Sequence, residues 1–444
     1  MTEQEVGART QRKGLTGDLP AFTRDPLHFL TVTAREQGPV ARLRFGRSTA
    51  WLVCDPIHIE EVLIARRNSY VKARPLRAQS RLFGNGLLTN EGDSWLAQRR
   101  LAQPAFHRSH IASYARTMVE STRDMLDCLP DTGVIEIHAE LRRLTMRIVA
   151  TALFGSDVSS QTDELSIALD ASMDRYASRR GLARLVPEWV PLPVNRRYHS
   201  GIDHIDAIVS DMIVRRRKSP KPHLDLLSML LDARDEDGGR MNDQQLRDEA
   251  ITLFVGGFDT PALALSWAWF LLAGNPEVQT RLADEVDALL GDREATMDDL
   301  AQLTYTGAIV KEVLRLYPPA WLIARDAIED TLIGGHQIRA GASVLISQWV
   351  MHRDARYFES PEVFLPDRWL DQTPPPPSRG IYFPFGVGPR VCIGASFAAM
   401  EMTLALATIA QRMKFVLSPS ARVEPWATMT LRPRHGIDVK LERR

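Results

Sequence analysis

Residues 385–394 read FGVGPRVCIG and lead directly into ASFAAMEMTLALATIAQRM, an apolar segment that is expected to form a helix. The stretch places Cys392 just before the N-terminus of that helix. The partial positive charge and free N–H groups at a helix N-terminus lower a thiol pKa and can hydrogen-bond a thiolate sulfur. Glycines at 386, 388 and 394 remove side chains where the backbone must bend or approach a flat ligand closely, and Arg390 adds a cation two residues before the sulfur. An isolated cysteine is more often a small buried apolar residue, but the whole arrangement indicates a thiolate loop.

A second segment, residues 250–274 (AITLFVGGFDTPALALSWAWFLLAG), is long enough to span a bilayer and carries a single charge. That charge, Asp259, lies near its centre, where insertion into a membrane costs about 2.5–3.5 kcal/mol. A helix that is apolar on all sides is equally suited to the core of a large soluble protein. We therefore expect a buried core helix without membrane insertion, with Asp259 facing a cavity.

The same segment contains a predicted kink. Pro261 has no N–H, so the carbonyl of Gly257 loses its helical partner and the helix opens locally. The hydroxyl of Thr260 can reach the carbonyl of Gly256 by the same spacing. A buried and unpaired acid either protonates or finds a partner, so Asp259 is a candidate for proton transfer. The alternative is a structural kink with a satisfied aspartate.

Helical periodicity dominates the rest of the chain, which predicts a mainly α protein. The long helical patterns cover residues 111–128, 141–154, 202–217 and 299–316. Two β regions are expected: residues 40–45 and 48–54 around Gly46, and residues 331–338 and 342–348 on either side of a turn at Gly341. No linker or repeat interrupts the pattern, so we expect one domain over residues 21–444 after a flexible segment at residues 1–20.

Composition narrows the function and the compartment. The 55 basic and 55 acidic residues give a formal net charge of zero, which argues against a nucleic-acid partner. Three cysteines, an odd number spread along the chain, favour a reducing compartment over a disulfide framework. The charged N-terminal residues are not followed by an apolar segment, so we expect a cytoplasmic protein without a signal peptide or N-terminal anchor. The G-x-G-x-x-G, Walker and G-x-S-x-G motifs are absent, so a dinucleotide, ATP or hydrolase site has no sequence support.

The thiolate loop resembles the haem-binding loop of cytochrome P450 enzymes, F-x-x-G-x-R-x-C-x-G. Every fixed position of that pattern is matched, by Phe385, Gly388, Arg390, Cys392 and Gly394. The resemblance implies that Cys392 is the axial thiolate ligand of haem iron. Such a ligand pushes electron density onto the iron and favours O–O cleavage.

The apolar helix resembles the family's I-helix pattern, [AG]-G-x-[DE]-T. Gly256, Gly257, Asp259 and Thr260 match it, which implies that Asp259 and Thr260 are catalytic residues that deliver protons to oxygen. Pro261 departs from the small or hydroxylated residue that is common at the next position.

Two further patterns concern charged residues. Glu312 and Arg315 lie three apart and would usually form a surface ion pair, but they resemble the family's E-x-x-R, and Arg368 in FLPDRW matches the third member of that structural network. Trp95 and Arg99 resemble the W-x-x-x-R that binds a haem propionate. Arg325 matches the other propionate-binding position, and with Arg390 the resemblance supplies three cations for two carboxylates.

The resemblance implies a single P450 domain, a helical bundle with small β-sheets that encloses a buried haem b. The implied reaction is monooxygenation of a lipophilic small molecule of terpenoid, fatty-acid or polyketide type. Electrons would come from NAD(P)H through a ferredoxin and a ferredoxin reductase. The residues expected over the haem are 76–88, 176–190, Leu253, Val255, Leu322, Ile323, Met429 and Leu431.

Two alternatives stay open. The first is a P450-fold enzyme that couples or rearranges its substrate without inserting oxygen, and the second is a non-enzymatic haem-thiolate sensor. The acid and alcohol pair at 259 and 260 weighs against both.

Overall fold

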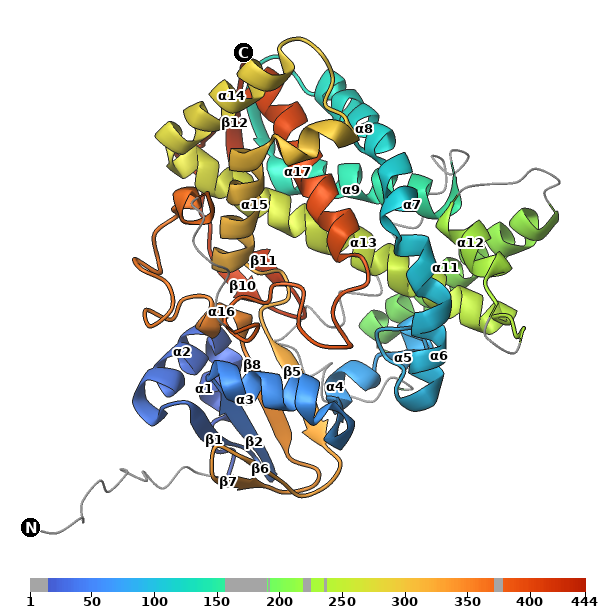
Figure 1. Ribbon diagram of the computed structural model, residues 1–444, viewed down its shortest axis with the longest axis vertical. Helices are drawn as coiled ribbons and strands as arrows, with labels where there is room; N and C mark the ends of the chain where they lie inside the picture. Colours follow the sequence, from blue (N-terminus) through green and yellow to red (C-terminus); the bar gives the residue numbers. More distant parts are fainter. Residues whose placement is uncertain (1–14, 156–189, 191, 219–224, 235–237, 371–377) are drawn as a thin grey trace, which may run out of the picture.

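The computed structural model describes residues 15–155, 190, 192–218, 225–234, 238–370 and 378–444. Helices dominate this part of the chain, which confirms the mainly α prediction (Figure 1). The helices are α1 (Leu19–Arg24), α2 (Pro26–Gln37), α3 (Pro56–Glu60), α4 (Arg74–Arg77), α5 (Ser80–Phe83), α6 (Gly92–Ala102), α7 (Arg108–Ser113), α8 (Ala115–Cys128), α9 (Ile137–Phe154), α11 (Pro193–Lys218), α12 (Leu226–Asp232), α13 (Asp243–Gly274), α14 (Pro276–Leu290), α15 (Thr304–Leu316), α16 (Gln348–Met351) and α17 (Ala395–Arg412).

In the described part of the chain the strands form four small sheets. They are β1 (Val40–Phe45), β2 (Ser48–Val53), β3 (Tyr70–Lys72), β4 (Gly133–Glu136), β5 (Ile323–Ala327), β6 (Thr331–Ile333), β7 (His336–Ile338), β8 (Ser343–Ile346), β9 (Met413–Leu417), β10 (Pro425–Ala427), β11 (Leu431–Pro433) and β12 (Asp438–Arg443). The largest sheet has the order β1-β2-β8-β5-β3, β4-β12-β9 form a second, and β10-β11 and β6-β7 form two hairpins. In Figure 1 the largest sheet lies below the helical part of the molecule, with α1, α2 and α3 beside it.

The predicted β regions are confirmed in position and corrected in pairing. β1 and β2 form the expected antiparallel hairpin around Gly46, whose φ of +62° suits a glycine. Residues 331–338 are instead two strands, because the glycines at 334 and 335 both adopt positive φ and turn β6 back onto β7. β8 pairs in parallel with β2 and antiparallel with β5, so the sheet joins segments from both ends of the chain.

The predicted helices are present with different ends. The pattern at 111–128 is divided at Tyr114 into α7 and α8. The pattern at 299–316 begins as a 3₁₀ turn, Met297–Ala301, because the Asp299 side chain accepts hydrogen bonds from the backbone and hydroxyl of Thr296 and thereby caps that turn. α9 and α11 begin earlier than expected, at Ile137 and Pro193.

α13 is the central helix of the fold (Figure 1). It is 32 residues long and begins with a capping box, in which the Asn242 side chain accepts from the backbone of Gln245 and the Gln245 side chain accepts from the backbone of Asn242. Among the helices of the described residues, α13 alone is long and apolar enough to cross a membrane. However, 83% of its apolar 18-residue stretch is buried inside the protein. The prediction of a buried core helix is therefore confirmed.

α9 packs closely along α13. A Cβ at Gly257 would lie 2.5 Å from Cγ2 of Val149, so only glycine allows this approach of the two helices. Thr145 of α9 also donates its hydroxyl to the carbonyl of Phe258, at 2.8 Å. Together these contacts fix the turn of α13 that precedes Pro261.

The last residues of the predicted N-terminal segment contact the largest sheet. Residues 1–14 lie outside the described residues, but the segment after them pairs with β1. The backbone of Asp18 donates to the carbonyl of Arg44 at 2.6 Å, and the Asp18 carboxylate accepts from the backbone of Arg44 at 2.9 Å. Reciprocal bonds of this kind hold the last residues of the predicted flexible segment, 1–20, against the sheet.

Candidate active site

The thiolate loop is shaped by two glycines in the left-handed region, Gly386 with φ of +75° and Gly388 with φ of +80°. A Cβ at Gly388 would lie 2.5 Å from the carbonyl oxygen of Leu63, so this position also lacks room for a side chain. The backbone N–H of Cys392 donates to the carbonyl of Phe385 at 2.9 Å and closes the loop. α17 begins three residues after Cys392, as predicted. Gly394 has an ordinary φ of −89°, so it is not required by the turn itself.

The Cys392 side chain is exposed, and because Cys392 lines a cavity, this exposure is to the cavity. Burial raises the pKa of the Cys392 thiol, while the N–H of Gly394 and the charge of Arg99 lower it. The N–H at the start of α17 thus lowers this pKa as predicted, but in the polypeptide alone desolvation outweighs the hydrogen bond and the cation. A metal ion bound to the sulfur would reverse the balance, since a coordinating thiol is deprotonated outright.

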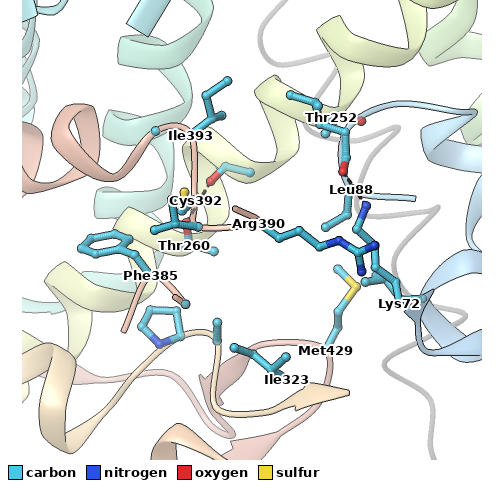
Figure 2. Close-up of a pocket in the computed structure, with 18 of the residues that line it drawn as sticks. Lys72, Leu88, Thr252, Thr260, Ile323, Phe385, Arg390, Cys392, Ile393 and Met429 are labelled. Carbon is cyan, nitrogen blue, oxygen red and sulfur yellow. Dashed lines mark hydrogen bonds between the residues drawn. The ribbon is translucent and has the colours of Figure 1, made fainter. Parts of the chain in front are cut away.

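The cavity has a volume of about 940 Å³ and is bounded by the thiolate loop, α13, the segment before β5, the residues around α4 and the turn between β10 and β11 (Figure 2). The residues expected over the haem that do line it are Leu76, Ala78, Gln79, Leu87, Leu88, Leu253, Leu322, Ile323 and Met429. Val255 and Leu431 are instead packed in the core, 4% and 0% exposed, and residues 176–189 lie outside the described residues. The wall is mostly apolar and suits a lipophilic ligand.

Four cations line the cavity: Lys72, Arg99, Arg325 and Arg390. No aspartate or glutamate is among the lining residues in the described part of the chain. Arg390 and Lys72 both lie over the ring of Trp95, with 5.6 and 5.5 Å from the cation to the ring centroid, and Figure 2 shows the Arg390 side chain reaching from the loop toward Lys72. Such a concentration of positive charge is suited to carboxylates on a ligand.

Lys72 is the member of this cluster that the sequence did not reveal. It is 6% exposed, and its Nζ donates to the carbonyls of Leu87 at 2.9 Å and Asn90 at 2.5 Å. Burial lowers its pKa to about 7, against the opposing charge of Glu91. Glu91 also pairs with Arg390 at 2.5 Å and accepts from the backbone N–H of Lys72 at 2.5 Å, so one carboxylate that is not among the lining residues contacts both Arg390 and Lys72. A lone lysine in a short strand carries no motif, and only the fold brings it to this edge.

Thr260 lies as predicted. It lines the cavity, and its hydroxyl donates to the carbonyl of Gly256 at 2.8 Å. Nothing lies within 4 Å of a Cβ built at Gly256, so the open side of the helix is at 256, whereas Gly257 faces Val149. α13 continues as a helix through Pro261.

Asp259 does not face the cavity, contrary to prediction. It is 2% exposed and is not among the lining residues. Its carboxylate pairs with Arg432 at 2.6 Å and accepts from the hydroxyl of Thr430 at 3.3 Å. The aspartate is therefore satisfied, as in the alternative of a structural kink, because an arginine 173 residues later in the chain supplies the partner.

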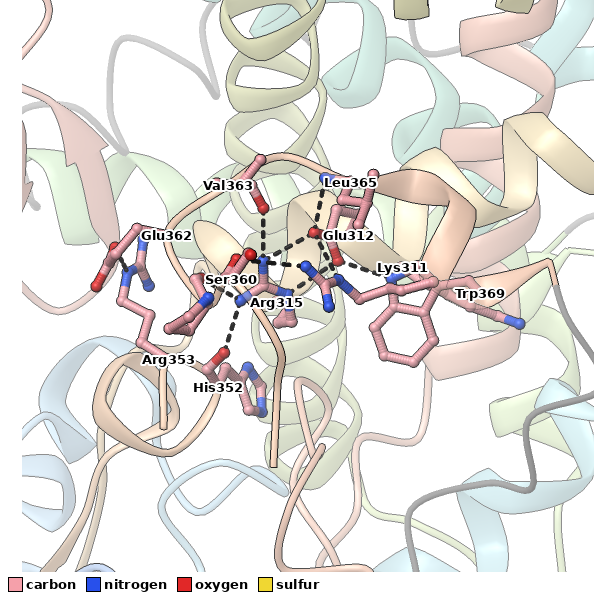
Figure 3. A network of polar contacts seen from close by, with 12 residues as sticks. Lys311, Glu312, Arg315, His352, Arg353, Ser360, Glu362, Val363, Leu365 and Trp369 are labelled. Carbon is pink, nitrogen blue, oxygen red and sulfur yellow. Dashed lines mark hydrogen bonds and ion pairs between the residues drawn. The ribbon is translucent and has the colours of Figure 1, made fainter. Parts of the chain in front are cut away.

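The predicted charge network is assembled beside the loop (Figure 3). Glu312, 0% exposed, accepts from Arg315 Nε at 2.9 Å and Nη2 at 2.8 Å, and from Arg368 Nε at 3.1 Å. The backbone N–H of Leu365 and the indole of Trp369 complete its partners, at 3.0 and 2.8 Å. Burial alone would raise the pKa of Glu312, but the hydrogen bonds and charge of Arg315 bring it below its usual value.

This network reaches the thiolate loop through His352. Arg315 Nη1 donates to the carbonyl of His352 at 2.8 Å, and His352 Nε2 accepts from the backbone of Phe383 at 3.0 Å. The carbonyl of Phe383 in turn accepts from Gly386 at 2.9 Å. Burial and the neighbouring charges of Arg315 and Arg353 lower the pKa of His352 to about 3, so its ring is neutral and Nε2 can accept.

Several known proteins are similar to this chain over nearly its whole length. Cyclooctatin synthase from Streptomyces melanosporofaciens is 36% identical over 94% of this chain and 91% of its own length. Pentalenene oxygenase from Streptomyces avermitilis is 33% identical over 92% of this chain and 91% of its own length. The solved structure of retinoic acid bound cyanobacterial CYP120A1 is 25% identical, with a TM-score of 0.86 over 97% of each chain. The family model for cytochrome P450 matches residues 11–441, and the chain therefore belongs to the cytochrome P450 family.

Proposed function

We propose that this chain is a haem-thiolate monooxygenase that hydroxylates or epoxidises a terpenoid-type molecule, with Cys392 as the axial ligand of haem b. The observation that carries the proposal is one cavity whose wall holds a cysteine thiol, four cations and the Thr260 hydroxyl. When bound there, haem would supply O₂ binding and transfer of one oxygen atom to carbon, with two electrons and two protons reducing the other atom to water.

The residues present fit an iron porphyrin that carries two propionates. Cys392 offers its sulfur to the cavity, and in the described residues no group of three or more His, Cys, Asp or Glu side chains competes as a metal site. Arg99, Arg325 and Arg390 would bind the propionates together with Trp95, and Lys72 adds a fourth cation. Phe385 and Gly394 would shape the loop around the sulfur.

Two residues of α13, Asp259 and Thr260, would transfer protons. Because the Thr260 hydroxyl donates to Gly256, its oxygen lone pairs are available to accept a hydrogen bond from the cavity side. Asp259 is the next residue and carries the acid, so proton delivery would run from Asp259 through Thr260. The carboxylate of Asp259 is itself held by an ion pair with Arg432.

The apolar wall and the relatives support the substrate class. Leu253, Leu322 and Met429 line the cavity and exclude water from the reacting region. One relative is named for cyclooctatin and another for pentalenene, which makes terpenoids of secondary metabolism the preferred class over fatty acids and polyketides.

Electrons would come from NAD(P)H through a ferredoxin and a ferredoxin reductase in the cytoplasm. The family match over residues 11–441 supports this proposal, because membership of the cytochrome P450 family implies electron supply by redox partners.

The test is a binding and turnover assay on the haem-loaded protein. Pentalenene, retinoic acid and lauric acid are titrated while the ferric absorption spectrum is followed, because a ligand that displaces water from the iron changes the spin state. We expect a terpenoid to shift the spectrum, and to be oxidised with ferredoxin, reductase and NADPH. A response only to lauric acid would overturn the terpenoid assignment.

The same assay separates the alternatives. The variant Thr260→Ala should divert electrons to hydrogen peroxide and lower product yield about 10-fold or more, the scale of one proton-transfer group. Unchanged yield would instead favour coupling or rearrangement without oxygen insertion. A protein that neither turns over nor changes spin state with any probe would favour the sensor.

A further inference from the structure

The carboxylate of Asp259, which is not among the residues that line the cavity, is held by the hairpin of β10 and β11. Arg432 of β11 donates from Nη2 to Asp259 Oδ1 at 2.6 Å, and Thr430 donates its hydroxyl to Oδ2 at 3.3 Å. Arg432 Nε also donates to the Thr430 hydroxyl oxygen at 3.1 Å, so the three side chains form a closed ring of hydrogen bonds. The side chain of Asp259 is 3% exposed and that of Arg432 is 24% exposed, so Arg432 connects the buried acid to the surface.

The backbone that carries these two side chains is fixed to α13. Leu431 lies between them, and its carbonyl accepts from the indole of Trp267, a residue of α13, at 3.0 Å. Its N–H donates to the carbonyl of Pro319 at 2.9 Å. The preceding turn residue, Thr428, is held by the indole of Trp321 at 3.0 Å. Arg432 and Thr430 therefore start from a backbone whose position relative to Asp259 is set.

The same hairpin also meets the cavity. Thr428 and Met429 line it, and the hydroxyl of Thr428 donates to the carbonyl of Thr430 at 2.8 Å. Residues that line the cavity and residues that hold the acid thus occupy one turn, 428–430, and the strand that follows it.

A carboxylate at so buried a position needs hydrogen-bond partners, because its desolvation is costly. The guanidinium of Arg432 and the hydroxyl of Thr430 provide these partners and fix the direction in which the Asp259 carboxylate points. A general acid must release and regain a proton in each cycle, and both steps depend on these partners.

We propose that Arg432 is the positioning residue for Asp259 and that, with Thr430, it controls the supply of protons from Asp259 to Thr260. This inference rests on the proposed function, because it assigns a positioning residue to Asp259, the acid of that mechanism. It extends the proposed function by placing that residue on β11, a strand that contains none of the sequence motifs.

The experiment compares haem-loaded wild type with Asp259→Asn, Arg432→Gln, Arg432→Lys, Thr430→Val and the double variant Asp259→Asn/Arg432→Gln. The probe is whichever of pentalenene, retinoic acid and lauric acid gives the largest spin shift. NADPH consumption, peroxide and product are measured in H₂O and in D₂O. The matched control is Arg434→Gln, on the same hairpin, which removes an exposed pair with Glu424 at 2.9 Å.

We expect Arg432→Gln to slow proton-dependent turnover about 10-fold or more, to raise the peroxide fraction and to enlarge the solvent isotope effect, as Asp259→Asn does. The double variant should be no slower than Asp259→Asn, because Arg432 acts through that acid. Arg432→Lys should recover at least half of the wild-type rate, and Arg434→Gln should match wild type. A merely structural ion pair would lower stability and leave the isotope effect unchanged.

The outcomes separate this inference from the proposed function. If Arg432→Gln behaves like wild type while Asp259→Asn is slow, the role of Arg432 is overturned and the proton role of Asp259 stands. Wild-type behaviour of Asp259→Asn overturns the proton role in the proposed function. If Arg432→Gln does not fold, Thr430→Val decides. This variant loses the two ring hydrogen bonds of the Thr430 hydroxyl, which should still enlarge the isotope effect, and an unchanged effect there refutes the proposal.

Discussion

Replacement of Glu312 by Gln should remove much of the stability of this protein. The carboxylate accepts five hydrogen bonds, two from Arg315 and one each from Leu365, Arg368 and Trp369, and it is 0% exposed. Gln keeps the shape but loses the charge, and its NH₂ group meets only donors. Arg315, also 0% exposed, would then be a buried cation without its counter-ion.

The magnitude follows from what is left unpaired. Breaking one side of a buried ion pair costs about 3–5 kcal/mol, against a total stability of about 5–15 kcal/mol for a folded protein. Because Arg315 also anchors His352, which holds Phe383 at the base of the thiolate loop, the loss should reach the site. We expect Glu312→Gln to unfold at much lower urea concentration and to retain little haem.

The assay is urea unfolding of the haem-free protein, followed by the fluorescence of its 9 tryptophans. Since Arg315 holds the pKa of Glu312 below its usual value, the carboxylate stabilises the fold above the unfolded pKa of about 4.3, and this contribution is lost as the pH falls through the lower folded value. The difference from wild type should therefore be full at pH 7 and shrink in acid. Glu120→Gln, which breaks the exposed pair with Arg116, is the control and should not move the midpoint. A Glu312→Gln variant that unfolds within about 1 kcal/mol of wild type at pH 7 would refute the reasoning.

Two other variants test the cavity wall. In the haem-free protein burial lowers the pKa of Lys72 to about 7, so the folded state sheds this proton above pH 7 while the unfolded state keeps it up to about 10.5. The stability of wild type relative to Lys72→Met should therefore rise between pH 7 and about 10.5 and be constant below pH 7. Urea midpoints that show no such rise would contradict the burial of the charge. Gly388→Ala should abolish haem retention, measured by absorbance, because its Cβ would lie 2.5 Å from the Leu63 carbonyl at a φ of +80°. The control is Gly341→Ala, where φ is +83° and nothing lies within 4 Å of the added Cβ. This variant should cost about 1–2 kcal/mol of backbone strain and keep its haem. Equal haem loss in both variants would mean that backbone strain, and not the steric contact with Leu63, decides haem retention.

The sequence was sufficient where chemistry depends on neighbours along the chain. The turn at Cys392, the hydrogen bond from Thr260 to Gly256 and the facing pair of Glu312 and Arg315 all follow from spacing within one helix or loop. Spacing also located the core helix, because an apolar segment interrupted by Asp259 is poorly suited to a membrane.

The sequence was insufficient where the fold joins distant segments. Arg432 meets Asp259 across 173 residues, and no local pattern marks either as a partner of the other. Lys72 enters the cation cluster only because β3 pairs with β5, which carries Arg325. The pKa of Cys392 also depends on burial, a property of the assembled cavity, and this reversed the expectation from the helix terminus alone.

The central claim is that the sulfur of Cys392 bonds haem iron. It is tested most directly by reducing the haem-loaded protein under carbon monoxide and recording its absorption, with circular dichroism to confirm that the Cys392→Ala variant is folded. The account predicts the strongly red-shifted band of a thiolate-bound complex in wild type and its loss in the folded variant. A wild-type protein that binds haem and lacks this band, or a variant that keeps it, would contradict the account.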